Sequence, residues 1–399
     1  MDFDVVIAGG GLVGASLACA LRDTPLRVAL VEAVAPEADE QPSYDERAIA
    51  LSLGSKQTLE RFGVWPGLAE AATAIRQVHV SDRGHFGATR LRAADENVEA
   101  LGYVAEARAI GAGLAAALEG AANLERLCPA RVADVQAARD GATAVVSDAE
   151  GGAREVRTRL VVAADGADSA LRRKAGAFSY GRDYHQVAVT ATVETDRPHG
   201  GVAYERFTDS GPLALLPFSG GAAGARRWGV VWTVDAADRE AVESMDEAAF
   251  LAALQARFGH RAGTFRTTGP RCSYPLALRL VPRFVTRRQV FIGNAAHVVH
   301  PVAGQGFNLG LRDVAELARL LKEAAGRGED AGGAPLLRRY IRRRRPDYAA
   351  VAGITDGFVR AFTSRLPPVV AARNAGLLGL ELFPPAKHAL ARRLMGLWS

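Results

Sequence analysis

The chain has 399 residues, of which 49% are hydrophobic and 23% are charged. Domains average roughly 100–200 residues, so this length predicts two domains and a large buried core. The composition is typical of a globular protein and excludes a disordered or fibrous chain. A formal net charge of +5 permits an acidic partner without requiring one.

The cysteines and the N-terminus indicate the cellular compartment. Cys19, Cys128 and Cys272 lie far apart and form no CxxC pair, which disfavours a disulfide framework and favours a reducing compartment. The apolar start of the chain carries Asp2 and Asp4 in place of the basic leader of a signal peptide. No run of about 18 uncharged apolar residues occurs. These features predict a cytoplasmic protein.

The first 35 residues predict a strand, a glycine turn, a helix and a second strand. Residues 3–8 form a Val- and Ile-rich run typical of a buried parallel strand. An alanine-rich helix follows at about residues 14–22, and residues 26–31 form a second such strand. This order is a βαβ unit. Two further strands of the same kind, residues 159–164 and 289–292, occur far downstream.

Segments of another character lie between these strands. Residues 186–194 and 227–234 alternate polar and apolar side chains as antiparallel strands do, and residues 211–218 are similar. We therefore predict an α/β fold with a discontinuous Rossmann-like domain, an inserted antiparallel β-sheet domain that binds the substrate, and a C-terminal helical region. The predicted boundaries are 1–75, 100–180 and 270–330 for the first, 76–99 and 181–269 for the second, and 331–399 for the third.

A glycine fingerprint follows the first strand. Gly9, Gly11 and Gly14 have the GxGxxG spacing, in which the glycines allow a tight turn, close approach of a pyrophosphate and close helix packing. The helix that begins there offers free amides to the phosphates. Glu32 ends the second strand, where a carboxylate accepts hydrogen bonds from a ribose. The pattern predicts dinucleotide binding but does not separate NAD from FAD.

Two downstream segments favour FAD. DGADSALR (residues 165–172) and GNAAHVVHPVAGQGFNLGLRD (residues 293–313) each place small residues and a polar side chain directly after a buried strand. In the second segment, Gly304-Gln305-Gly306 bares backbone amides at the positive end of a predicted helix, where they can stabilise negative charge on a reduced flavin ring. An NAD fingerprint needs no such distant third element, whereas an extended FAD does.

Together, the three segments resemble the flavoprotein aromatic hydroxylases of the para-hydroxybenzoate hydroxylase fold. Four further segments are similar to the ubiquinone-biosynthesis hydroxylases, and within them most similar to the branch that acts on 2-polyprenyl-6-methoxyphenol. These are DERAIALSLGSKQTLERFGVW (residues 45–65), VHVSDRGH (78–85), YERFTDSGPLALLP (204–217) and HPVAGQGFNLGLRDV (300–314).

The resemblance implies which residues hold the cofactor. Asn294 stands where the wider superfamily usually has Asp, so one charged contact is lost although an amide still accepts from a ribitol hydroxyl. Arg47 and Arg108 would supply charge-assisted bonds near the ribitol or the phosphates. The cofactor-binding residues are Gly9, Gly11, Gly14, Glu32, Arg47, Arg108, Asp165, Gly166, Asn294, Gly304 and Gly306, and the ring is lined by Pro301, Gly304, Gln305 and Gly306.

The resemblance also implies the reaction. NAD(P)H would reduce FAD, and oxygen would add to the flavin to give a hydroperoxide that hydroxylates the ring of a polyprenylated phenol in ubiquinone biosynthesis. The implied partners are this phenol, molecular oxygen and a quinone-biosynthesis complex, with no metal and no nucleic acid. No catalytic base is identified from the sequence.

Several alternatives stay open. A sister enzyme of the same pathway would hydroxylate another ring carbon, and a non-catalytic flavin protein would scaffold the quinone-synthesis complex. Two other enzymes of the same fold are a halogenase and a reductase of prenyl chains. The halogenase signature WxWxIP is absent, since the nearest segment reads WGVVWTV from Trp228.

Some polar side chains have both a functional and a structural interpretation. His297 and His300 form an HxxH pair, but no third ligand lies nearby, so metal binding is disfavoured. Tyr204, Arg206 and Phe218 could face the substrate, although sheet packing is the commoner role of such residues.

The C-terminal region combines a basic run with an apolar one. Residues 338–345 read RRYIRRRR, which predicts a solvated helix face or, as the next interpretation, contact with an anionic membrane surface. Residues 369–383 are apolar apart from Arg373 and Glu381, which predicts packing against the main body or assistance in that contact. The protein would then be peripheral on the inner face of the membrane.

Overall fold

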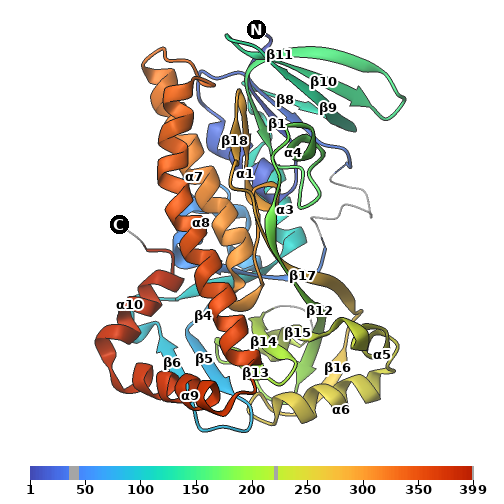
Figure 1. Cartoon of the computed structure of the whole chain (residues 1–399). Helices are drawn as coiled ribbons and strands as arrows, with labels where there is room; N and C mark the ends of the chain where they lie inside the picture. The colour runs from blue at the N-terminus through green and yellow to red at the C-terminus, as the bar shows by residue number, and fades with distance from the viewer. Residues whose placement is uncertain (36–44, 220–222, 398–399) are drawn as a thin grey trace.

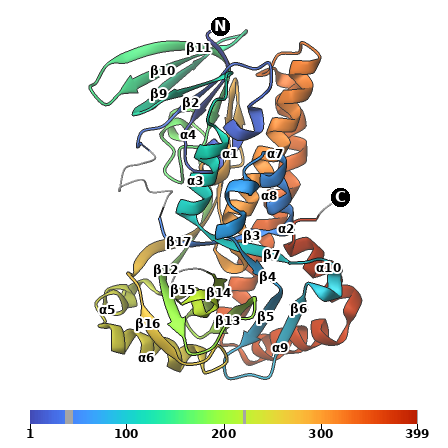
Figure 2. The same ribbon diagram turned by 180° about the vertical axis from the view of Figure 1, so that it is seen from behind.

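Two large β-sheets and a set of long helices form the computed structural model, which describes residues 1–35, 45–219 and 223–397 (Figures 1 and 2). One sheet lies at the end of the molecule that carries the N-terminus, and the other lies at the opposite end. A small third sheet lies between them. The predicted α/β class, with parallel and antiparallel sheets, is confirmed.

The first sheet has eight strands and a parallel centre. β1 pairs in parallel with β2 and with β11, β11 pairs in parallel with β19, and β9 and β10 form an antiparallel extension. The carboxyl ends of the parallel strands therefore meet at one edge. The strands are β1 (Phe3–Ala8), β2 (Val28–Val31), β8 (Leu124–Leu127), β9 (Ala130–Ala137), β10 (Ala142–Asp148), β11 (Ala153–Ala163), β18 (Val285–Thr286) and β19 (Gln289–Phe291).

The predicted strands and helix are found, with shifted bounds. β11 is longer than predicted because its first half pairs antiparallel with β10, and from Thr158 onward it continues in parallel with β1. α1 (Leu12–Leu21) begins two residues before the predicted start, and its residues from Gly14 to Leu21 are all buried. β2 begins at Val28 rather than at residue 26.

Helices cover this sheet and complete its core. α1 packs against α3 (Ala107–Ala117) and α7 (Gln305–Gly326), and α7 packs against α8 (Ala334–Thr363). The buried leucines Leu309, Leu317 and Leu321 share one face of α7, as the helical spacing requires. α2 (Leu53–Arg61) and α4 (Ala170–Lys174) are shorter.

The second sheet has nine strands, and all its pairs are antiparallel except that of β13 with β5. Its strands are β5 (Gln77–Asp82), β6 (Ala88–Arg92), β12 (Tyr180–Thr195), β13 (Val202–Thr208), β14 (Gly211–Phe218), β15 (Arg227–Asp235), β16 (Phe265–Thr268), β17 (Cys272–Leu280) and β20 (His297–Val298). α5 (Arg239–Glu243) and α6 (Glu247–Phe258) lie beside it. Trp228, Val230 and Trp232 point from β15 into the core shared with α6.

The small sheet joins β3 (Ala48–Ser52), β7 (Gly102–Glu106) and β4 (Thr73–Ile75). Short 3₁₀ helices fill several connections. They are η1 (Trp65–Gly67), η2 (Ala69–Ala71), η3 (Ala94–Glu96), η4 (Gly224–Arg226), η5 (Ala236–Asp238), η6 (Gly293–Ala295) and η7 (Val302–Gly304).

Three helices follow the glycine-rich connection that ends at Gly333. α8 runs along the molecule from the first sheet to the second, and α9 (Pro367–Leu382) and α10 (Pro384–Leu394) lie at the end that holds the second sheet (Figure 1). Within the described ranges, no helix combines the length and the apolar composition that crossing a bilayer requires. The domain boundaries given above stay a prediction.

The arginine run lies in the first half of α8 and is only partly solvated. Arg338, Arg342, Arg343 and Arg345 are exposed, as a solvated face requires. Arg344 is 5% exposed and points into the protein, so the prediction is wrong for this residue. The cause is a buried carboxylate on α7, which is described below.

Candidate active site

The glycine fingerprint lies at the carboxyl edge of the first sheet, where ligands of parallel α/β sheets bind. Gly9 has a φ of +101°, and a Cβ there would lie 2.5 Å from the carbonyl oxygen of Ala164. A Cβ on Gly14 would lie 1.8 Å from the carbonyl oxygen of Gly9. Gly11 precedes the first residue of α1 and provides no side-chain cap, so the first amides of the helix stay available to a ligand.

Glu32 follows β2 at the same edge. Its carboxylate accepts the Val34 N–H at 2.9 Å and also the Gly10 N–H. A Cβ on Gly10 would lie 2.9 Å from the Cβ of Glu32, so the glycine turn and the carboxylate are closely packed. This arrangement places an anionic acceptor beside the turn, where the sequence predicts a ribose.

Arg47 and Arg108 lie close together although 61 residues separate them. The Ala107 N–H donates to the Arg47 carbonyl at 3.0 Å, and the Arg108 N–H donates to the Asp45 carbonyl at 2.9 Å. The Arg47 side chain pairs with Asp45 at 2.5 Å, and that of Arg108 pairs with Glu106 at 2.6 Å. Both guanidinium groups are thus held by carboxylates, where the segment before β3 meets the end of β7 and the start of α3.

Asp165 and Gly166 follow β11. The Oδ2 atom of Asp165 accepts the Leu171 N–H at 3.4 Å, while its buried Oδ1 has no hydrogen-bond partner among the described residues. Gly166 has a φ of +85°, and a Cβ there would meet no atom within 4 Å. A buried acceptor beside open space fits a ligand that carries hydroxyl groups.

The third motif lies at the start of α7. Gly304 caps this helix in the left-handed conformation without a side-chain bond, and a Cβ on Gly306 would meet no atom within 4 Å. Gln305 donates from Nε2 to the Ala303 carbonyl at 3.0 Å. Asn294 is exposed in η6. The helix terminus therefore presents free amides to open space, as an anionic ring requires.

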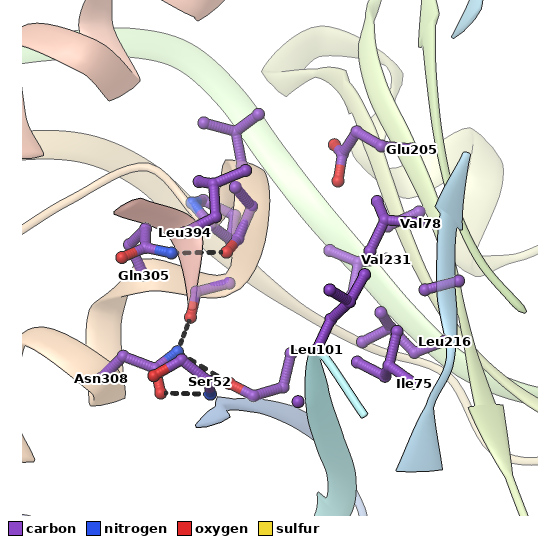
Figure 3. Close-up of a pocket in the computed structure, with 18 of the residues that line it drawn as sticks. Ser52, Ile75, Val78, Leu101, Glu205, Leu216, Val231, Gln305, Asn308 and Leu394 are labelled. Atoms are coloured by element: carbon purple, nitrogen blue, oxygen red, sulfur yellow. Dashed lines mark hydrogen bonds between the residues drawn. The ribbon is translucent and has the colours of Figure 1, made fainter. Parts of the chain in front are cut away.

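An apolar cavity of about 180 Å³ lies between this helix terminus and the second sheet (Figure 3). In Figure 3, Gln305, Asn308 and Leu394 lie on one side, and Val78 and Leu216 lie on the other. An apolar cavity of about 150 Å³ admits benzene, so this volume is sufficient for one substituted aromatic ring. The lining includes the predicted ring-lining residues Pro301, Gly304 and Gln305, and also Ala391, Leu394 and Met395 near the C-terminus.

Asn308 connects the start of α7 to β3 of the small sheet. Its Nδ2 atom donates to the carbonyls of Ala50 and Gly304, and its Oδ1 atom accepts the Ser52 N–H at 2.9 Å. The side chain is 3% exposed. It therefore fixes β3 against the start of α7, a role that the sequence prediction missed.

Glu205 is a second residue that the prediction missed. It lies on β13 and lines the cavity, and Figure 3 shows its carboxylate pointing into the space. Burial raises the pKa of Glu205 to about 7, and a hydrogen bond from the Ala303 N–H opposes this rise. The signal in the sequence was the alternation of β13, because Tyr204 and Arg206 share one face and Glu205 lies on the other.

The buried carboxylate of Asp313 bonds to residues at the start of the third motif. Asp313 is 0% exposed, and its Oδ2 atom lies 3.0 Å from the Gly293 nitrogen and 2.8 Å from Nε2 of His297. Its Oδ1 atom accepts from Arg344 at 2.8 Å and from Tyr348 at 2.7 Å. Burial alone would raise the pKa of Asp313, but Arg344 and His297 outweigh it and lower the pKa to about 2.

The HxxH pair divides between two environments. His297 pairs with Asp313, whereas His300 accepts the Val302 N–H at 3.2 Å and burial lowers its pKa to about 4. Among the described residues, no group of three or more His, Cys, Asp or Glu side chains is arranged to hold a metal ion. The two histidines thus have structural partners.

The aromatic candidates of the second sheet pack in its cores. Tyr204 contributes to the cavity wall, but its ring packs 5.4 Å from Phe258 and 5.7 Å from Trp228. Phe218 is 2% exposed. The Nε atom of Arg206 is buried without a hydrogen-bond partner among the described residues.

Known proteins resemble this chain over most of its length. The family described as "FAD binding domain" matches residues 2–354. A ubiquinone hydroxylase, UbiL of Rhodospirillum rubrum, is 38% identical over 398 residues, with 98% of this chain and 89% of that protein covered. A 3-demethoxyubiquinol 3-hydroxylase of Escherichia coli is 30% identical, with 99% and 98% covered. The chain belongs to the FAD-dependent ubiquinone hydroxylases.

The fold is also similar to that of a solved monooxygenase. The crystal structure of a p-nitrophenol 4-monooxygenase of Pseudomonas putida superposes with a TM-score of 0.78 at 21% identity, covering 98% of this chain and 96% of that one. The chain of this FAD-dependent ubiquinone hydroxylase thus has the fold of the flavin monooxygenases. Its cofactor is FAD, and NAD(P)H is the usual reductant of such enzymes.

Proposed function

We propose that this FAD-dependent ubiquinone hydroxylase hydroxylates the ring of a polyprenylated phenol, 2-polyprenyl-6-methoxyphenol, with NAD(P)H and molecular oxygen. The observation that supports this substrate is the apolar cavity beside the third motif, which has room for one ring and whose described lining carries a single carboxylate. One oxygen atom enters the ring, the other leaves as water, and NAD(P)H supplies the two electrons.

We assign the predicted residues to the two ends of FAD. Gly9, Gly11 and Gly14 would approach the pyrophosphate, and Glu32 would accept from the ribose. The unpaired Oδ1 atom of Asp165 supports its contact with a hydroxyl group of the cofactor. When bound, FAD supplies the activation of oxygen, while the chain excludes water from the apolar cavity and orients the phenol.

The site of hydroxylation separates this proposal from its nearest alternative. The relative from Escherichia coli is named for hydroxylation at a 3-position, so a sister activity at another ring carbon is the second candidate. A flavin-binding assembly protein without turnover is the third. All three share the cofactor, and the product distinguishes them.

The experiment uses the purified yellow protein with 2-polyprenyl-6-methoxyphenol. We expect the phenol to accelerate NAD(P)H oxidation and to be converted into a product with one more oxygen atom, identified by mass spectrometry. Hydroxylation of a later intermediate alone would favour the sister activity. Unstimulated oxidation without any hydroxylated product would favour the assembly protein.

We further propose that the outer face of α9 contacts an anionic bilayer surface, because the prenyl chain of the substrate exceeds the cavity. Leu366, Leu378, Leu382 and Phe383 are 64%, 41%, 72% and 59% exposed. Exposed apolar patches of this kind mark interaction sites. Arg365 and Arg392 are exposed in the same C-terminal region, and their positive charge complements an anionic surface.

The charged residues within α9 are directed toward the protein. Arg373 pairs with the buried Asp82 at 2.8 Å, and Glu381 accepts from Thr89 at 3.1 Å. The exposed face therefore stays apolar between Leu366 and the end of the helix. α10 follows directly and provides the cavity wall at Leu394, so the proposed lipid contact lies next to the proposed substrate site.

Replacing Leu382 and Phe383 together by Asp should weaken binding to phosphatidylglycerol vesicles at least tenfold, since burying one such side chain contributes about 1.5–3 kcal/mol. Vesicle co-sedimentation measures this change. The double variant Arg342→Ala, Arg343→Ala in the first half of α8 tests the arginine run separately: unchanged vesicle binding means that the run is a solvated face, whereas weaker binding means that it also contacts the bilayer. If the Asp variant instead dissociates an oligomer and keeps its vesicle binding, the face is a protein interface.

A further inference from the structure

Successive side chains of β13 point to opposite faces of the sheet, so that of Glu205 lies on the face opposite to those of Tyr204 and Arg206. The ring of Tyr204 packs with Phe258, and Arg206 lies on the same side. Glu205 points to the opposite side, into the cavity. Among the described lining residues, Glu205 alone carries a carboxylate, and none carries a Lys, Arg or His side chain.

The carboxylate of Glu205 has one polar partner and no cationic one among the described residues. The Ala303 N–H donates to it, and no salt bridge to it is formed within the described ranges. Ala303 follows Pro301 in the loop predicted to line the flavin ring, and its φ is +58° although it has a side chain. Such backbone strain concentrates at functional sites. The carboxylate and the strained loop thus meet at the cavity.

The hydroxyl group of a phenol can donate a further hydrogen bond to the carboxylate of Glu205. A carboxylate in an apolar cavity without a cation needs hydrogen bonds, and the remaining lining offers mainly aliphatic side chains. An aromatic ring placed in the cavity can satisfy the carboxylate with its hydroxyl group while the aliphatic side chains contact the ring and its substituents.

We propose that Glu205 is a catalytic residue that takes the proton of the phenol hydroxyl when the ring is hydroxylated. The O–H bond breaks, its electron pair stays on the phenol oxygen, and the proton binds an Oε atom of Glu205. The resulting phenolate is the more electron-rich ring, which an electrophilic oxygen attacks faster. After the ring carbon has lost its hydrogen as a proton, Glu205 returns its own proton to the product oxygen. This role rests on the proposed function, because it requires a phenol.

The pKa of Glu205 suits the role of a general base. Burial raises the pKa of Glu205 to about 7, so the carboxylate gains its charge near neutral pH, where a general base is most effective. The other ionisable side chains of the lining are Tyr204 and Tyr274, and burial raises the pKa of both. They stay neutral at pH 7, so the charge of the lining changes at Glu205.

The first test compares Glu205→Gln with wild type on a 2-prenyl-6-methoxyphenol that has one isoprene unit. We expect kcat to fall by about 10²–10⁴-fold, with FAD content and KM little changed. The wild-type rise of kcat/KM with pH near 7 should disappear. A fluorinated analogue of this phenol that is already ionised at the assay pH should recover most of the rate. The control is Glu240→Gln on the exposed surface of α5, which should change nothing.

The second test needs no turnover. Two anions repel each other in an apolar cavity, so binding of 4-nitrophenolate at pH 8 should cause Glu205 to take up a proton. We expect about one proton per bound nitrophenolate in weakly buffered solution for wild type, and none for Glu205→Gln. The Glu240→Gln variant should behave as wild type.

The outcomes separate the two proposals. If wild type hydroxylates the phenol but Glu205→Gln keeps its pH profile, or loses equal rates on both phenols, Glu205 is not the base and the proposed function stands. Absence of proton uptake by wild type with bound nitrophenolate also overturns the role of Glu205. If wild type binds and hydroxylates no phenol, both proposals fail.

Discussion

The Asp313→Asn variant is expected to lose about 3–5 kcal/mol of stability, because it breaks a buried ion pair and leaves the guanidinium of Arg344 with Asp347 as its remaining carboxylate partner. Arg344 would keep its guanidinium inside the protein, 5% exposed, without the carboxylate that now accepts from its Nε. Urea unfolding followed by circular dichroism measures the loss. The control is Asp140→Asn on the exposed surface, which should change stability by less than about 0.5 kcal/mol.

The same network predicts a dependence of stability on pH. The folded protein lowers the pKa of Asp313 from 3.8 to about 2, so the ionised carboxylate stabilises the fold above pH 4. This contribution is lost as the pH falls from about 4 to 2, because the carboxylate then takes up its proton. Asp313→Asn should lack that part of the acid transition. An unaltered acid transition in the variant would contradict the assignment.

The loss should extend to the cofactor site. Asp313 accepts the Gly293 N–H, so its carboxylate positions the turn that carries Asn294. Asp313→Asn that still folds at low temperature should therefore retain less FAD than wild type. The flavin absorbance of the purified protein relative to its protein absorbance measures this retention.

The Gly14→Val variant should contain almost no FAD. A Cβ at this position would lie 1.8 Å from the carbonyl oxygen of Gly9, and neither backbone segment can move without displacing the start of α1 from the sheet. The amides predicted to hold the pyrophosphate would move with it. Flavin content after gentle purification measures the effect, which should exceed that of any single polar substitution in the site.

A glycine in another helix provides the matched control. Gly353 lies on the exposed surface of α8, and a Cβ there would meet no atom within 4 Å. Gly353→Ala should keep its full FAD content and gain up to about 1 kcal/mol in stability, since Ala favours a helix. A Gly14→Val protein with full flavin content would show that the fingerprint does not hold the cofactor.

The sequence alone was sufficient for the cofactor class and the general fold. The run of β1, the glycine turn, α1 and Glu32 is local, so each residue type reports directly on the backbone that it permits. Gly9 and Gly14 are examples, because the close backbone contacts leave no room for a Cβ. The third motif could be read for the same reason, since Gly304-Gln305-Gly306 opens α7.

Long-range packing decided the rest. In the sequence, Arg344 does not differ from its neighbours in the arginine run. It is buried because its side chain bonds to Asp313 on the adjacent helix α7. Asp313 itself left a signal, a carboxylate at helical spacing between Leu309 and Leu317 on an apolar face. Residue type alone could not tell which cation would approach it.

The ionisation state of Glu205 and the outer face of α9 show the same division. The alternation of β13 separates Glu205 from Tyr204, but the apolar surroundings come from β3, β14, β15, α10 and the loop at Ala303. Local sequence thus determined the backbone turns and the nucleotide fingerprint, which depend on neighbours a few residues away. Tertiary structure decided which charges are buried and which apolar face stays outside, because desolvation depends on residues that are distant along the chain.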